Sequence, residues 1–343
     1  MDNSRKIYLL LIIAGTLMVM IYAQSIILPF IIAVLFWFMI RIIKKLLLRI
    51  KFADRLPGWF QTIISTLILL GIAVVVVSLL TVNIQQLSSA LPGYEENIKK
   101  ITTTINDAFR IDIVSSLKDY SRDYNFTNLL SSTISAITGL FGDALMVVLY
   151  LLFILLEEPG FNSKLKAMYP QETNYVHMTN LIDKIDQSIS DYLGIKTLVS
   201  LMTGACSFIV LLIIGVDAPL FWAFLIFILN FIPAIGSLVA TVFPAVFALF
   251  QFGEFTQATL ILAIVGSLQL VFGNFIEPRL MGNSLNISPL VVFLTLALWG
   301  TIWGITGMLL SVPITVILII IMSEFHGTRR VAILLSRKVR QNE

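Results

Sequence analysis

Residues 280–323, LMGNSLNISPLVVFLTLALWGTIWGITGMLLSVPITVILIIIMS, form the longest uncharged run of this chain. A membrane-crossing helix needs about 20 apolar residues, so this run is long enough for two crossings. It contains helix-interrupting signals between Gly300 and Gly307 and at Pro313. Other uncharged runs cover residues 7–40, 56–94, 124–142, 144–156, 197–216, 218–253 and 255–276. The sequence therefore predicts an all-α polytopic membrane protein of about eight transmembrane helices, with broken or re-entrant segments in the C-terminal half.

The composition supports this fold class and excludes several functions. Hydrophobic residues make up 58% of the 343 residues and charged residues 13%, which is more apolar surface than a soluble core of this size can bury. The single cysteine, Cys206, provides neither a disulfide framework nor a cysteine metal site. The chain has no phosphate-binding loop of the Gly-x-x-x-x-Gly-Lys-Ser/Thr type and no His-Glu-x-x-His motif. We expect no enzyme activity, no cofactor, no metal and no nucleic-acid partner.

The basic residues predict the orientation in the membrane. A basic cluster connects the second and third apolar segments and contains Arg41, Lys44, Lys45, Arg49, Lys51 and Arg55. The positive-inside rule places this connection in the cytoplasm, and with it the N-terminus and the basic C-terminal tail. The N-terminal run lacks a small-residue cleavage site, so we expect it to remain as a helical hairpin.

These assignments divide the chain into six predicted regions. They are transmembrane helices 1–3 (residues 1–82), an extracytoplasmic helical insertion (83–128), transmembrane helix 4 (129–156), a cytoplasmic amphipathic helical segment (157–196), a C-terminal transport bundle (197–323) and a basic cytoplasmic tail (324–343). The transport bundle is predicted to contain helix breaks at 230–236 and 274–282.

The extracytoplasmic insertion contains apolar residues spaced by three and four, the pattern of a helix that packs against other helices. Candidate subunit contacts in this stripe are Leu87, Leu91, Tyr94, Ile98 and Ile101. The alternative, which we favour, is that the stripe packs on its own protomer or on the membrane surface. In the cytoplasmic segment, the side chains from Leu181 to Leu193 form one apolar face of an amphipathic helix that leads directly into the span beginning near Thr197.

The sequence NFIEPRLMG at 274–282 is a candidate functional site. Between Lys196 and Glu324 the only charged residues are Asp217, Glu254, Glu277 and Arg279. A charged side chain near the bilayer centre costs about 2.5–3.5 kcal/mol, so such residues usually face a partner, a cavity or a substrate path. Glu277 and Arg279 are two positions apart and do not face each other on a helix, so each needs a different partner. Alternatively, both lie at the cytoplasmic end of a span.

A similar sequence, NFIPAIGS at 230–237, precedes this site and suggests a weak internal repeat. Proline leaves nearby carbonyl groups without helical partners, and paired helix interruptions often frame transporter binding sites. The candidate substrate or ion pathway therefore contains Asn230, Pro233, Gly236, Ser237, Gln269, Asn274, Glu277, Pro278, Arg279, Gly282, Ser311 and Pro313.

The polar insertion, the two sequences at 230–236 and 277–282, and Gly307–Pro313 together resemble the autoinducer-2 exporter family of bacterial membrane transporters. The resemblance covers essentially the whole chain and is most specific from about 190 to 320. It implies about eight spans, a homo-oligomer in the bacterial cytoplasmic membrane, and export of small solutes. The best-known substrate class is autoinducer-2, a small polyhydroxylated quorum-sensing signal. Other members of the family resemble sodium or lithium ion/proton antiporters.

Three functions remain open from the residues. An uncharged polyol needs amide and hydroxyl partners, which Asn230, Ser237, Gln269, Asn274 and Ser311 could provide. A sodium or lithium ion/proton antiporter needs a membrane-embedded carboxylate, for which Glu277 is a better candidate than Asp143 or Asp217. A non-transporting scaffold would account for the heptad stripe and the basic tail but not for the interrupted helices. We favour export of a small polar solute, with the lipid bilayer and a second copy of the chain as further partners.

Overall fold

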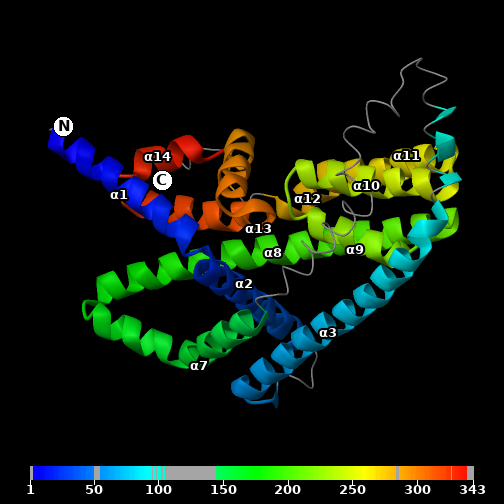
Figure 1. Ribbon diagram of the computed structural model, residues 1–343. Coiled ribbons are helices and arrows are strands. Elements are labelled where there is room, and N and C mark those ends of the chain that lie inside the picture. The colour runs from blue at the N-terminus through cyan, green and yellow to red at the C-terminus, as the bar shows by residue number, and fades with distance from the viewer. Residues whose placement is uncertain are drawn as a thin grey trace. The chain divides into compact units, whose positions relative to one another are not determined.

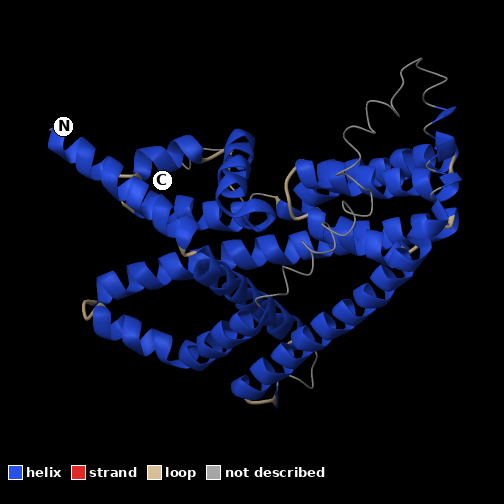
Figure 2. Cartoon of the chain, viewed as in Figure 1, coloured by secondary structure: helices blue, strands red, loops and turns tan. Residues whose placement is uncertain are grey.

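A computed structural model describes residues 3–49, 55–94, 96–97, 99–101, 103–104, 144–282, 286–325 and 327–337. These residues form helices joined by turns, with no strand among them (Figure 2). Within this part of the chain, seven helices are long and apolar enough to cross a membrane, and a shorter apolar helix accompanies them. The predicted all-α polytopic fold is therefore confirmed.

Figure 1 labels the helices along the chain. The longer ones are α1 (Asn3–Tyr22), α2 (Gln24–Leu47), α3 (Gly58–Ala90), α7 (Ala144–Met168), α8 (Glu172–Ile214), α9 (Pro219–Leu229), α10 (Ile235–Phe252), α11 (Phe255–Val271) and α13 (Pro289–Glu324). The short elements are the 3₁₀ turn η2 (Leu91–Tyr94), the π-helical segment η3 (Phe272–Ile276), α12 (Glu277–Met281) and α14 (Arg329–Leu335).

The chain forms two compact units. Unit 1 comprises Met1–Thr66, Leu140–Gly194 and Asn283–Glu343, and unit 2 comprises Leu67–Gly139 and Ile195–Gly282. The long helices α3 and α8 each begin in unit 1 and end in unit 2. The region boundaries predicted at residues 82 and 196 therefore fall inside continuous helices. The segment predicted to be cytoplasmic and the span that follows it form one helix, α8, which continues through Gly194.

In unit 1, α2 and α7 lie against each other, and a polar network joins α2 to its neighbours. Arg41 Nη1 is 2.8 Å from Asp186 Oδ1 on α8, and its guanidinium lies 4.9 Å from the ring centre of Trp37. Trp37 Nε1 donates to Glu158 Oε2 on α7 at 3.0 Å. On α8, Ile189 is fully buried, so the apolar face predicted for this segment packs inside the protein.

Unit 2 is built around a helical hairpin made by α9 and α10. Helix α9 ends at Leu229 and α10 begins at Ile235, within the segment predicted to break. Ala234 has a φ of +58°, which reverses the chain. A Cβ atom at Gly236 would lie 1.8 Å from the carbonyl oxygen of Leu229, so only glycine allows the two helix ends to approach so closely. Figure 1 shows α10 and α11 lying side by side after this turn.

The segment 274–282 differs from the predicted break. The chain stays helical through η3 and α12. The helix ends at Met281, and the following residue, Gly282, has a φ of +51°. Proline lacks an N–H, so Pro278 cannot continue the α-helical hydrogen bonding. The helix widens to the π form just before it, and the N–H of Glu277 bonds to the carbonyl of Phe272. The two similar sequences therefore form different local structures, because 230–236 contains the turn between α9 and α10, whereas 274–281 stays helical.

A different pair of segments shares the hairpin geometry. In unit 1, α13 changes direction at Gly304, where φ is +60° (Figure 1). Gly304 follows the opening Pro289 by fifteen residues, as Ala234 follows Pro219 in unit 2. A Cβ atom at Gly307 would lie 1.9 Å from the carbonyl oxygen of Trp299, which repeats the close approach at Gly236. Among the described residues, each unit thus contains a helix pair that meets at a residue of positive φ and is followed by a glycine in close contact with the preceding helix.

Candidate solute site

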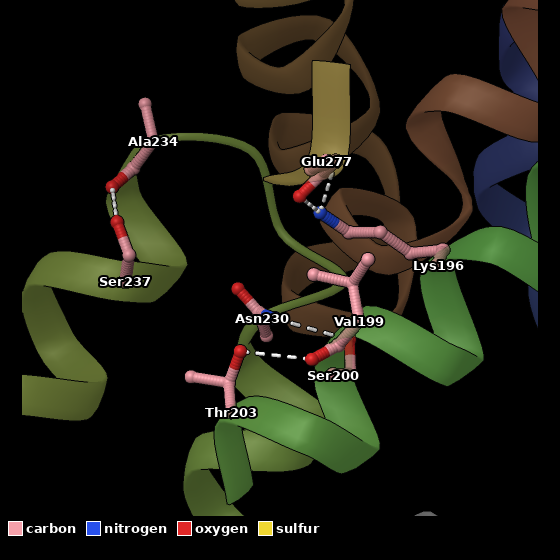
Figure 3. Close-up of polar contacts among 8 residues, drawn as sticks. All are labelled: Lys196, Val199, Ser200, Thr203, Asn230, Ala234, Ser237 and Glu277. Atoms are coloured by element: carbon pink, nitrogen blue, oxygen red, sulfur yellow. Dashed lines mark hydrogen bonds and ion pairs between the residues drawn. The ribbon is translucent and has the colours of Figure 1, made fainter. Parts of the chain in front are cut away.

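A buried ion pair lies within the helices of unit 2. Lys196 Nζ on α8 is 2.6 Å from Glu277 Oε1 and 2.8 Å from Oε2, so the ammonium group donates to both oxygens of the carboxylate (Figure 3). The side chain of Lys196 is 6% exposed and that of Glu277 is 18% exposed. Both residues belong to helices long and apolar enough to cross a membrane. Charges at such a place are expensive unless they are paired, which explains why each has the other as partner.

A neutral hydrogen bond lies one helical turn from this ion pair. Asn230 Nδ2, at the end of α9, donates to Ser200 Oγ on α8 at 3.2 Å, and both residues are buried. Thr203 Oγ1 donates to the carbonyl of Val199 within α8 at 2.8 Å. Figure 3 shows these groups below the contact between Lys196 and Glu277.

These polar residues lie on one face of α8. Lys196, Ser200, Thr203 and Ser207 follow one another at spacings of four, three and four, and all are buried. Such spacing places side chains on the same side of a helix. The face meets α9 closely, because a Cβ atom at Gly204 would lie 3.1 Å from the carbonyl oxygen of Ala223. We call Lys196, Ser200, Thr203, Ser207, Asn230 and Glu277 the polar face of unit 2.

A second polar cluster joins the start of the first insertion to the connection between α8 and α9 and to the end of α10. The Tyr94 hydroxyl donates to the carboxylate of Asp217, and Asn97 Nδ2 donates to the carbonyl of Gln251 at 2.6 Å. Gln251 Oε1 accepts the backbone N–H of Asp217 at 2.8 Å, and Gln251 Nε2 donates to the carbonyl of Gly215 at 2.9 Å. The pKa of the Tyr94 phenol is raised. Burial is the largest cause, and the hydrogen bond to Asp217 and the negative charge of Asp217 add to it.

Comparison with known proteins identifies the family. The AI-2E family transporter profile matches residues 10–327. This chain belongs to that family. It is 32% identical to the AI-2 transport protein TqsA of Escherichia coli K12 over 97% of this chain and 96% of that protein. It is 34% identical to a putative transport protein of Borreliella burgdorferi, over 73% of this chain and 68% of the relative. A putative transport protein of Haemophilus influenzae is 29% identical over 91% of this chain and 90% of its own length.

The family membership and the helices together establish a multi-pass membrane transporter of a bacterial family. Such a protein is in contact with the lipid bilayer. This AI-2E transporter contains several charged or polar residues that sequence reasoning selected, and the structure places them in different surroundings.

Three of the predicted pathway residues lie in or beside the polar face. Glu277 and Asn230 belong to it, and Gln269 is buried on α11. Pro233, Gly236 and Ser237 form the hairpin turn, where Ser237 Oγ donates to the carbonyl of Ala234 at 2.9 Å (Figure 3).

The other predicted pathway residues do not belong to the polar face. Asn274, Pro278, Arg279 and Gly282 are exposed, so Arg279 does not share the environment of Glu277. Ser311 and Pro313 are buried on α13 in unit 1, where Ser311 Oγ donates to the carbonyl of Met308 at 2.7 Å. Asp143 lies outside the described residues, and Asp217 bonds to Tyr94 rather than to a group on the polar face.

The predicted subunit-contact stripe is largely buried within the protomer. Leu87, Tyr94 and Ile101 are 0%, 8% and 4% exposed. Leu87 and Tyr94 belong to the apolar core of unit 2. This is the placement expected when the stripe packs on its own protomer. The side chain of Leu91 and the residue Ile98 lie outside the described residues. A contact between subunits through this insertion stays a prediction.

Sequence reasoning missed Lys196. We treated it as the end of the cytoplasmic insertion because it immediately precedes an uncharged run. The available signal was its helical spacing to Ser200, Thr203 and Ser207, which continues a polar face into the span. A lysine at this position lies on the same face of the helix as the polar residues of the span. It therefore belongs to the span as well as to the segment before it.

Proposed function

We propose that this transporter exports a small polar solute of the autoinducer-2 type, and that the solute passes along the polar face of unit 2. The observation that carries the proposal is the buried pair of Lys196 and Glu277 next to the hydrogen bond between Ser200 and Asn230. Hydroxyl and amide groups of this kind can exchange their mutual hydrogen bonds for bonds to a neutral polyol. The likeness to TqsA, a protein named for AI-2 transport, supports this substrate class.

The ion pair of Lys196 and Glu277 has a structural role in the proposed export, and the two side chains stay paired while the solute passes. A neutral solute needs no charge to bind it, and Lys196 and Glu277 hold α8 and α12 together while the solute uses the neighbouring neutral groups. We propose that Asn274 and Arg279, which are exposed, contact solute only outside this buried region.

The wider context of the proposal follows from the basic residues and the family. We propose that the protein acts as a homo-oligomer in the bacterial cytoplasmic membrane, with both termini in the cytoplasm. It carries out no enzymatic reaction and needs no cofactor. The basic connection between α2 and α3 supports this orientation, because Lys and Arg are concentrated on the cytoplasmic side of membrane proteins.

Exchange of sodium or lithium ions for protons is the second candidate function. Glu277 favours it, because a buried carboxylate is the group that such a transporter needs. The ammonium of Lys196 already occupies both oxygens of this carboxylate at 2.6 and 2.8 Å. A cation could bind there only after Lys196 leaves, which requires a partner for the displaced lysine. Solute export needs no such displacement, and we favour it for this reason.

Reconstitution into proteoliposomes tests the two functions side by side. One set of vesicles contains autoinducer-2 and the other contains sodium chloride under an imposed pH gradient, with protein-free vesicles as controls. We expect protein-dependent efflux of autoinducer-2. Protein-dependent recovery of the pH gradient by sodium, without autoinducer-2 efflux, would show that the antiporter is correct. Absence of both fluxes in correctly inserted protein would support a scaffold.

A further inference from the structure

Among the described residues of unit 2, four buried side-chain polar atoms have no hydrogen-bond partner, and three of them belong to residues that are at most 7% exposed. These three are Ser207 Oγ, Trp222 Nε1 and Gln269 Nε2. Their residues are 0%, 3% and 7% exposed. A buried polar atom without a partner destabilises a protein, so groups of this kind call for an explanation such as a bound molecule. The polar face of unit 2 contains Ser207, but the function proposed above gives Ser207, Trp222 and Gln269 no specific contact with the solute.

Two contacts show that Ser207 and Trp222 lie at a similar depth. Ser200 on α8 bonds to Asn230 on α9, and Gly204 on α8 lies against Ala223. These two contacts mean that α8 and α9 run in opposite directions. Ser207 is seven residues beyond Ser200, and Trp222 is eight residues before Asn230. At 1.5 Å per residue, both are about 11–12 Å from the hydrogen-bonded pair, on the same side of it.

The same reasoning places Gln269. The contact of Lys196 with Glu277 and the shared packing of Leu211 and Ile261 in the apolar core show that α11 also runs opposite to α8. Gln269 is eight residues before Glu277, about 12 Å along the helix, and lies on the buried face that includes Ile261 and Val265. A fourth unpartnered atom, Gln257 Oε1, is twelve residues farther along α11 and does not belong to this group.

The three groups lie on helices that also contribute residues to the apolar core of unit 2. Trp222, Leu211 and Val265 belong to that core, and the ring of Trp222 packs on Phe247 with the ring centres 4.9 Å apart. The arrangement therefore offers polar atoms beside a flat apolar surface. Such a combination suits a small molecule with hydroxyl or carbonyl groups on one side and C–H groups on the other.

We propose that Ser207, Trp222 and Gln269 form a binding subsite for a small uncharged solute with neighbouring oxygen acceptors, such as a polyol. The indole N–H can only donate, the serine hydroxyl can donate or accept, and the unpaired amide nitrogen donates. A set dominated by donors recognises oxygen atoms of a neutral solute and not a metal cation, which requires acceptors. This inference rests on the proposed function, and it adds the residues that select the solute.

The test measures binding and stability of the same variants. Ser207→Ala and Gln269→Leu remove the unpaired polar atom and keep the volume nearly constant, and Trp222→Phe removes the N–H and keeps an aromatic ring. Ser267→Ala is the matched control, because Ser267 is exposed on α11 and bonds to its own helix at Ala263. Titration calorimetry of the purified protein measures the affinity for autoinducer-2 and, as a plain polyol, for erythritol.

We expect each subsite variant to bind about tenfold more weakly, the loss of one hydrogen bond, while the control binds as wild type does. We also expect Ser207→Ala and Gln269→Leu to unfold at a higher temperature than wild type without solute, because an unpartnered atom has been removed. This opposite change of affinity and stability is not expected of residues that only support the fold. Equal affinity in all variants, or lower stability of both Ser207→Ala and Gln269→Leu, would overturn the proposal.

The outcomes also separate the subsite from the proposed function. Wild-type efflux of autoinducer-2 with unchanged binding in the variants would refute the subsite and leave solute export standing. Binding of erythritol that the variants lose, without any binding or efflux of autoinducer-2, would support the subsite and refute the substrate. If wild type binds neither compound, both the subsite and the proposed substrate class are wrong.

Discussion

Replacing Glu277 with glutamine removes the negative charge from the buried ion pair and keeps the shape of the side chain. Lys196 Nζ donates to both carboxylate oxygens, and the lysine side chain is only 6% exposed. Breaking a buried pair by removing one partner costs about 3–5 kcal/mol, because the remaining charge has no counterion. Glu277 is 18% exposed, so water partly reaches this place and we expect the lower end, about 3 kcal/mol. This is a change of about 150-fold in the unfolding equilibrium.

A double variant determines whether the cost comes from the unpaired charge. Lys196→Met together with Glu277→Gln replaces both partners with neutral side chains of similar length. Replacing both members of a buried pair is often neutral or stabilising. We therefore expect the double variant to regain most of the stability that Glu277→Gln loses. Arg279→Gln is the matched control, and because Arg279 is exposed we expect a change within about 0.5 kcal/mol.

The assay is unfolding by sodium dodecyl sulfate in mixed micelles, followed by circular dichroism for the four proteins under the same conditions. The three variants are compared with wild type at equal detergent composition, so that only differences are used. A loss below about 1 kcal/mol for Glu277→Gln would refute a tight buried pair. A double variant as unstable as the single variant would show that the loss arises from packing and not from the lysine charge.

Further predictions concern the hairpin, the neutral hydrogen bond and the tyrosine cluster. Gly236→Ala should strongly reduce the yield of folded protein in size-exclusion chromatography, because its Cβ would lie 1.8 Å from a backbone oxygen, whereas Gly273→Ala, with nothing within 4 Å, should be tolerated. Ser200→Ala leaves the amide of Asn230 without its partner, so we expect a loss of about 1–3 kcal/mol in the same unfolding assay and slower solute efflux; equal stability would contradict this. The folded protein raises the pKa of Tyr94 above its ordinary value of 10.0, so the protonated phenol is the form that folding favours. The stability that the raised pKa of Tyr94 contributes is fully present below pH 10 and is lost as the pH rises above 10. Tyr94→Phe should therefore reduce the loss of stability at alkaline pH.

Sequence reasoning recognised half of the central ion pair. Glu277 stood out because charges are rare between Lys196 and Glu324. We could not pair it from sequence, because its partner is 81 positions away and the contact depends on how α8 packs against the end of α11 and α12. Arg279 was equally prominent in the sequence and is exposed. Charge scarcity identifies expensive residues, but it does not show which of them are buried.

The two proline sites show a similar division. Asn230–Gly236 and Asn274–Gly282 contain nearly the same residues in the same order, and local reasoning predicts a helix break at both. The first is a reversal because Gly236 permits a close return to the end of α9. In the second, an extra residue before Pro278 and a wider π turn keep the chain helical. The segment that shares the positive φ and the close glycine contact lies at Gly304–Gly307, and it lacks the Asn-Phe-Ile sequence that marks the first turn.

The sequence by itself determined the solvent and the class of this protein. Long uncharged runs can be buried only in a bilayer, and a backbone in a bilayer must satisfy its own hydrogen bonds, so an all-helical membrane protein was the necessary result. The tertiary structure alone decided which polar residues meet. Lys196 and Ser200 lie on α8, Asn230 at the end of α9 and Glu277 on α12, and their contacts depend on helix direction, register and the close approaches at Gly204 and Gly236. These are long-range packing relations, and local sequence patterns do not contain them.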